Sequence, residues 1–225
     1  MRDAVTFAQR AAAGDMVYDW GIFSSAIACL GGGPPDQAIQ DIEHDRKLVP
    51  ESLFAQDIHV FCLSSAGRWE DARKTLLGLP QPTLETPFRG PALQAALVAA
   101  STRKPEELKK AREELLAEVK RAPMTFPEAI GWLSTLGFVD DAVALMHYWD
   151  PNPAGLQPNV WMFGPLTNNL RRDPRFMEVA ARIKLVNYWQ TSGHWPDYCS
   201  EPGLPYDCKA EAAKVLAAAT TTTKN

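Results

Sequence analysis

The hexapeptide GRWEDA at residues 67–72 indicates the fold, because two similar hexapeptides occur elsewhere in the chain. They are GPPDQA at residues 33–38 and GFVDDA at residues 137–142. In each, three residues separate a glycine from an acidic or amide residue that is followed by alanine. The glycines stand at positions 33, 67 and 137, so one interval is 34 residues and the next is 70, or two periods of 35. A regular period of this length is the signature of a repeat protein.

Each hexapeptide lies between two segments whose apolar residues recur at steps of three and four, as in amphipathic helices. A glycine suits the end of the first helix, where a positive φ is often needed, and acidic residues suit the first turn of the second. The small alanine allows the two helices to cross closely. The remaining unit is expected near residue 102, where Pro105 opens a helix and Leu108 replaces the alanine.

The period and the glycine-to-alanine turn resemble the tetratricopeptide (TPR) repeat, a helix–turn–helix unit of 34 residues. This resemblance implies an all-α fold, a TPR-like helical-hairpin solenoid (α-α superhelix) with four helical pairs in residues 19–150. We expect a lead-in helix at 1–18 and a helical cap with an irregular aromatic loop at 151–208. The last segment, 209–225, is expected to hold the end of a helix and then a disordered tail from residue 220. A non-repetitive helical bundle is the alternative.

The composition is that of a globular protein, with 225 residues, 46% hydrophobic and 22% charged. It excludes a fully disordered chain. The 27 acidic residues outnumber the 23 basic ones, giving a net charge of −4, so we expect no nucleic acid to contact this chain. No run reaches the 18 or so apolar residues that span a bilayer, so we expect no membrane insertion. No secretory signal is visible at the N-terminus.

In a TPR-like solenoid the first helix of each pair lines the concave surface. The resemblance therefore implies a binding groove of mainly apolar side chains, which are Trp20, Phe23, Ile27, Phe54, Asp57, Phe61, Leu93 and Leu97. A protein or peptide partner could dock there. We favour instead a groove filled by the chain's own C-terminal part, because an open apolar groove would promote aggregation. Self-association is a further possibility.

The four cysteines form no metal-binding pattern, and we expect no metal and no cofactor. Cys29 and Cys62 lie in apolar helical patterns and are predicted to be buried, inert thiols. Cys199 and Cys208 flank a turn-rich loop that a disulfide could close. That bond would favour an oxidising, extracytoplasmic (periplasmic) location, whereas its absence would leave a cytoplasmic one.

The segment around residues 173–199 resembles the extreme C-terminus of a group of bacterial regulators. The matching elements are DPRF at 173–176, Tyr188-Trp189, Gly193, WPD at 195–197 and Cys199. In those regulators a TPR-like region follows an effector domain, either a winged-helix DNA-binding domain or a class III adenylate cyclase. The resemblance implies an interaction or sensory module, with an effector domain in a longer protein or in a separate partner.

Signatures of catalysis are weak in this sequence. No phosphate-binding loop or nucleophile motif is present, and no two histidines share metal-ligand spacing. We therefore expect a non-catalytic binding module. The alternatives are an oligomerisation module, or an enzyme whose groove uses Asp57, His59 and His147.

Overall fold

The computed structural model describes residues 25–29, 35–48, 50, 52–79, 90–122, 126–148 and 159–222. Within these ranges every regular element is a helix and no strand occurs, which confirms the all-α class. The predicted lead-in helix at 1–18 lies outside them. Residues 25–29 are helical, and the helices that follow before residue 150 are α3 (Pro35–Leu48), α4 (Leu53–Ser65), α5 (Trp69–Leu77), α6 (Pro91–Thr102), α7 (Pro105–Arg121), α8 (Phe126–Leu136) and α9 (Val139–Tyr148).

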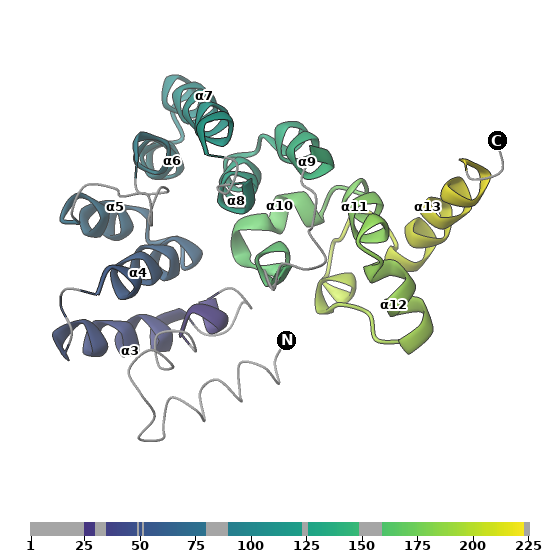
Figure 1. Cartoon of the computed structure of the whole chain (residues 1–225), viewed down its shortest axis with the longest axis horizontal. Coiled ribbons are helices and arrows are strands. Elements are labelled where there is room, and N and C mark those ends of the chain that lie inside the picture. The colour runs from purple at the N-terminus through teal and green to yellow at the C-terminus, as the bar shows by residue number, and fades with distance from the viewer. Residues whose placement is uncertain are drawn as a thin grey trace.

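These helices follow one another in an arc, each packed against the next along the chain (Figure 1). The α4–α5, α6–α7 and α8–α9 neighbours are antiparallel hairpins joined by short turns, and α6 also contacts α8. Residues near one period apart meet repeatedly. Asp140 pairs with Arg175 and Arg171 contacts Tyr206, each at a separation of 35.

The predicted glycine turns have the same geometry in two hairpins. Gly67 has φ 72° and Gly137 has φ 92°, a conformation that favours glycine. The amides of Gly67 and Arg68 donate to the carbonyls of Ser64 and Leu63. The same pair of bonds occurs within residues 133–138, between α8 and α9, in the Schellman arrangement that closes a helix.

The third hairpin closes without glycine. Arg103 adopts φ 55°, and its amide donates to the carbonyl of Ala99 at 2.9 Å, which ends α6 in a left-handed cap. The alanines that follow the glycine turns, Ala72 and Ala142, are fully buried. Their small side chains allow the close helix crossings expected from the hexapeptide.

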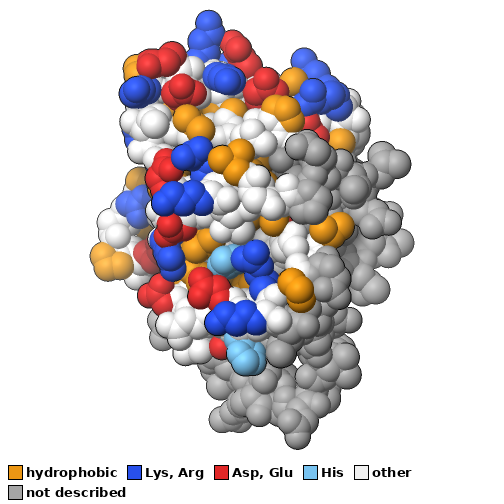
Figure 2. All heavy atoms as spheres, turned by 90° about the vertical axis from the view of Figure 1, so that its left-hand side faces the viewer, with side chains coloured by type: hydrophobic (Ala, Val, Ile, Leu, Met, Phe, Trp, Pro, Cys, Tyr) orange, Lys and Arg blue, Asp and Glu red, His pale blue; other side chains and the backbone are white. Residues whose placement is uncertain are grey.

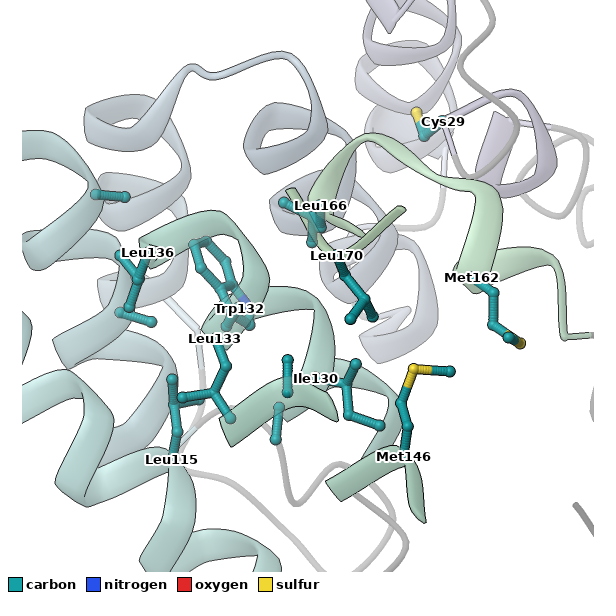
Figure 3. Close-up of a cluster of buried hydrophobic side chains, with 14 of the residues drawn as sticks. Cys29, Leu115, Ile130, Trp132, Leu133, Leu136, Met146, Met162, Leu166 and Leu170 are labelled. Atoms are coloured by element: carbon teal, nitrogen blue, oxygen red, sulfur yellow. The ribbon is translucent and has the colours of Figure 1, made fainter. Parts of the chain in front are cut away.

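One hydrophobic core extends along the arc and into the C-terminal part. Figure 3 shows its middle, where side chains of α8, including Ile130 and Leu133, lie with Met146 of α9 and with Met162, Leu166 and Leu170 from the segment after residue 158. The C-terminal part is therefore packed onto the helical array and shares its core.

After residue 158 the chain forms short helices before a final long one. They are η3 (Asn159–Phe163), η4 (Pro165–Thr167), α10 (Asn168–Arg171), α11 (Phe176–Arg182), α12 (Leu185–Ser192), η5 (Asp197–Ser200) and α13 (Cys208–Thr222). The segment of residues 159–171 lies on the inner side of the arc, against α8 and α4, whereas α12 and α13 pack on α11 (Figure 1). Because α13 includes residues 220–222, the helix extends beyond the predicted start of a disordered tail.

Candidate functional site

A cleft of about 370 Å³ opens between α4, α8 and the segment of residues 165–169. Its lining consists of residues 64–67, Trp69, Thr135, 165–166 and 168–169. Residues 64–67 are the last turn of α4 and its glycine cap, and Thr135 belongs to the last turn of α8. Two helices of the array thus direct their C-terminal ends at one cavity, whose size is within the usual range for ligand pockets.

Hydrogen bonds to the end of α8 fix the wall formed by residues 165–170. The Thr135 hydroxyl donates to the carbonyl of Leu166 at 2.9 Å, and the Leu170 amide donates to Ser134 Oγ at 3.0 Å. The Asn169 side-chain amide donates to the Ser134 carbonyl at 2.9 Å. The wall is therefore part of the folded framework.

A glycine in α8 allows this wall to approach closely. A Cβ added to Gly131 would lie 3.3 Å from Cβ of Leu166, closer than side chains usually pack. Helix α8 and η4 can therefore touch at Gly131, because this residue has no side chain.

The opposite wall carries an aromatic ring. A Cβ added to Gly67 would lie 3.9 Å from Cζ2 of Trp69, so the indole covers the glycine turn. The Trp69 ring also packs on Trp132, with 5.8 Å between ring centroids and 58° between their planes. Because Trp132 is buried in α8, this contact holds the indole at the cleft.

The cleft presents both polar and apolar surface, and no charged side chain is part of its lining. Its polar residues are two serines, a threonine and two asparagines. Ser65 Oγ is shielded from solvent and has no hydrogen-bond partner among the described residues. The carbonyl of Thr135 accepts a hydrogen bond from Nη1 of Arg103 at 3.3 Å.

The residues predicted from the TPR resemblance lie elsewhere, and none of them lines this cleft. Leu93 and Leu97 are buried core residues of α6, because that helix is enclosed by α5, α7 and α8. Ile27, Asp57 and Phe61 are half-buried, and Phe54 is 47% exposed. Trp20 and Phe23 lie outside the described residues.

The prediction of inert thiols at Cys29 and Cys62 was wrong. The two cysteines form a disulfide, with Cα atoms 5.3 Å apart and a sequence separation of 33. This separation is close to the interval of 34 residues between Gly33 and Gly67 in the sequence. The bond therefore ties the helical residues 25–29 to α4.

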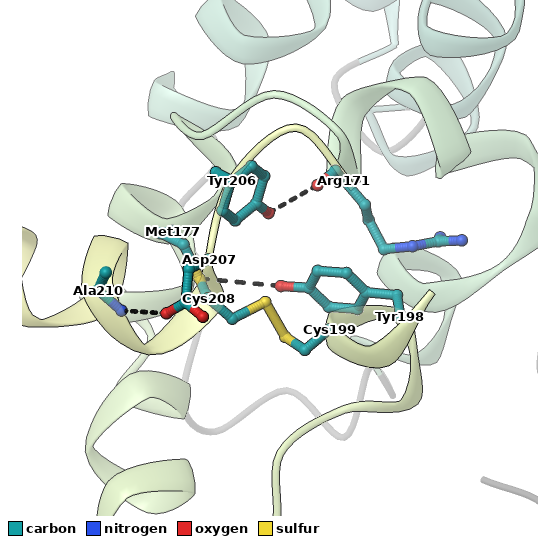
Figure 4. Close-up of a disulfide and its surroundings, with 8 residues drawn as sticks. All are labelled: Arg171, Met177, Tyr198, Cys199, Tyr206, Asp207, Cys208 and Ala210. Atoms are coloured by element: carbon teal, nitrogen blue, oxygen red, sulfur yellow. Dashed lines mark hydrogen bonds between the residues drawn. A yellow bond between two sulfur atoms is a disulfide. The ribbon is translucent and has the colours of Figure 1, made fainter. Parts of the chain in front are cut away.

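The second disulfide joins Cys199 to Cys208 at a Cα separation of 5.7 Å (Figure 4). It closes the loop between η5 and the start of α13. Beside it, the Tyr198 hydroxyl points at Met177 Sδ, and the Tyr206 hydroxyl donates to the carbonyl of Arg171 at 2.6 Å. The described residues contain no free cysteine.

Buried contacts support this C-terminal part. The guanidinium of Arg171 is buried and donates to the Gly164 carbonyl and the Thr167 hydroxyl at 2.6 and 2.8 Å. It also lies 5.8 Å from the ring centroid of Tyr198. Burial raises the pKa of Tyr198, and it raises the pKa of Tyr206 to about 12, so both phenols are neutral at physiological pH.

The two histidines considered for catalysis have different partners. His59 is buried, and its Nδ1 accepts a hydrogen bond from Arg46 at 2.6 Å, while Nε2 lies 3.6 Å from Glu43. Burial, and secondarily the Arg46 charge, lower the pKa of His59. His147 lies 4.0 Å from Glu178 of α11. Neither histidine lines the cleft.

Charged side chains of both signs occur together on one face of the molecule. Figure 2 shows acidic and basic side chains intermixed over one face of the array. Several form local pairs, such as Arg68 with Asp71 and Arg73 with Glu70. No group of three or more metal-ligating side chains occurs in the described ranges, and none of the helices described there could cross a membrane. No protein-family model, curated protein or solved structure matches the chain.

Proposed function

We propose that this chain is a non-catalytic binding module of TPR-like architecture that receives a peptide segment of a partner protein in the cleft between α4 and α8. The observation that carries the proposal is the cleft itself, which lies where two repeat turns and the segment of residues 165–169 meet. Hydroxyl, amide and carbonyl groups beside an indole are suited to binding a peptide.

The TPR-like arrangement is supported by the shared turn geometry and by the spacing of long-range contacts. Schellman bonds close the hairpins at Gly67 and Gly137, which are 70 residues apart. The Cys29–Cys62 bond and the Asp140–Arg175 pair join residues 33 and 35 positions apart. Since the latter pair crosses residue 150, we infer that the array continues into the C-terminal part.

Binding is favoured over catalysis by the chemistry of the lining. The lining has serine and threonine hydroxyls, but no histidine, cysteine, carboxylate or amine that could activate them or act as an acid or base. We propose a role in signalling or transcription regulation, because residues 173–199 resemble the C-terminus of bacterial regulators. The two disulfides support an oxidising, extracytoplasmic location.

A displayed library of random peptides, selected on the oxidised chain, tests the proposal. Selected peptides should shift the amide resonances of residues 64–67 and 168–169 in NMR spectra. Asn168→Arg places a long side chain in the cleft and should abolish their binding, whereas Asn187→Arg, on the exposed face of α12, should preserve it. Peptides that bind both variants equally, or shift resonances elsewhere, would contradict the proposal.

A further inference from the structure

We propose that the cleft recognises an alkylammonium group, supplied by a lysine side chain of the bound peptide. This inference rests on the proposed function and specifies its ligand. It follows from the direction of two helices, the absence of competing charge in the lining, and the position of one aromatic ring.

The first argument is electrostatic. Helices α4, with 13 residues, and α8, with 11, both end at the cleft. A helix C-terminus carries a partial negative charge equivalent to about half an electron, through carbonyls that lack intrahelical partners. The Schellman bonds of α4 use the carbonyls of Leu63 and Ser64, and the next two residues, Ser65 and Ala66, line the cleft. An ammonium donor is favoured at this position, and a carboxylate is disfavoured.

The structure already contains a cation at one of these helix ends. The exposed side chain of Arg103 donates from Nη1 to the carbonyl of Thr135, at the end of α8. This contact shows that the α8 terminus accepts a positive donor from outside its own helix. No lysine, arginine or histidine is part of the cleft lining, so the α4 side has no such donor within the cleft.

The remaining walls match the rest of a lysine side chain. Ala66, Pro165 and Leu166 provide apolar surface for the methylene groups. The indole of Trp69, held against Trp132, provides an aromatic ring near the glycine turn, and a cation is attracted to such a ring. Ser65 Oγ, which has no partner among the described residues, is available to accept a hydrogen bond after rotation of its side chain.

The test is an NMR titration of the oxidised chain with three capped tripeptides, Ac-Gly-Xaa-Gly-NH₂, in which Xaa is lysine, norleucine or glutamate. The lysine peptide should shift residues 64–67 and the Trp69 indole, and should bind about 5- to 30-fold more tightly than the norleucine peptide. The preference should shrink as salt is added. Equal or tighter binding of the norleucine or glutamate peptide would overturn the inference.

Two arginine variants test the electrostatic argument. Arg103→Asn removes the competing cation, and asparagine tolerates the left-handed backbone at this position, so binding of the lysine peptide should strengthen about twofold or more. The same change at another exposed arginine, Arg182→Asn in α11, should have no effect. An unchanged affinity in Arg103→Asn would contradict the electrostatic argument.

Two further results test whether the ammonium group comes from a peptide and whether the proposed function holds. n-Pentylamine should bind more weakly than the lysine peptide, and tighter binding of the free amine would refute a peptide source. If library peptides without a basic residue occupy the cleft, the proposed function stands and the ammonium inference fails. If neither library peptides nor the lysine peptide shift residues 64–67, both fail.

Discussion

Removal of the Cys29–Cys62 bond is expected to cost more stability than removal of the Cys199–Cys208 bond. The first closes a loop with a sequence separation of 33 and the second a loop with a separation of 9. From the entropy of the closed loop in the unfolded chain, the two bonds stabilise the fold by about 3.7 and about 2.6 kcal/mol, respectively.

Burial increases this difference. Cys29 and Cys62 are 1% and 0% exposed, whereas in the second bond only Cys208 is buried and Cys199 is half-buried. Replacement by alanine therefore leaves unfilled volume in the core at the first bond, which adds to the cost. The double variant Cys29→Ala/Cys62→Ala should lose at least about 1 kcal/mol more than Cys199→Ala/Cys208→Ala.

Guanidinium unfolding followed by circular dichroism, without reductant, measures both losses. For a chain of this length, 1 kcal/mol corresponds to a shift of about 2–4 °C in Tm. A reductant should destabilise the unmodified chain and each double variant, but not a variant that lacks all four cysteines. The reasoning is refuted if the Cys199→Ala/Cys208→Ala variant is the less stable of the two, or if the unreduced, unfolded chain has titratable thiols.

Three other changes test local features of the fold. Gly137→Ala should lower the free energy of unfolding by about 1 kcal/mol in urea, because an alanine at φ 92° is strained, and an unchanged midpoint would contradict the left-handed turn. The unfolding free energy should fall as pH drops below about 6.5, because His59 binds a proton more readily in the unfolded chain than when it is buried in the folded one. His59→Gln should flatten this pH dependence. Ser134→Ala leaves the buried Leu170 amide without its acceptor and should lower the free energy of unfolding by about 1–3 kcal/mol. Hydrogen exchange at that amide should become faster. Exchange as slow as in the unmodified chain would exclude the bond.

The hairpin turns were predictable because their residues act locally. A glycine followed by acidic residues and alanine specifies a helix end and a helix start within six positions, and Gly67 and Gly137 have the expected left-handed conformation. The third turn lacked this signal, since Arg103 adopts the same region without being glycine. Arg103 lies between α6 and α7, which pack against each other, and no short sequence motif marks this turn.

The Cys29–Cys62 bond had a signal in the sequence that local patterns did not reveal. The two positions are 33 residues apart, close to the 34-residue interval between Gly33 and Gly67, and the proposed repeat arrangement would bring such positions together. Considering each cysteine only within its own helix led to the prediction of free thiols. A search for cysteines one period apart would have found this pair.

The cleft was not predictable from periodicity. Trp69 belongs to the hexapeptide that indicated the fold, but that motif concerns only the turn. The other wall, at residues 165–169, is placed by side-chain bonds from Ser134 and Thr135 and by the close approach at Gly131. These contacts join residues about 30 to 36 positions apart, and the residue types involved are common in ordinary loops.

The most direct test of the central claim is a crystal structure of the oxidised chain with a selected peptide bound. The account predicts peptide density in the cleft between the C-terminal ends of α4 and α8, with a lysine side chain directed at the last carbonyls of α4 and its methylene groups beside Leu166. A peptide bound on another surface, with the cleft between Trp69 and Asn168 empty, would contradict it.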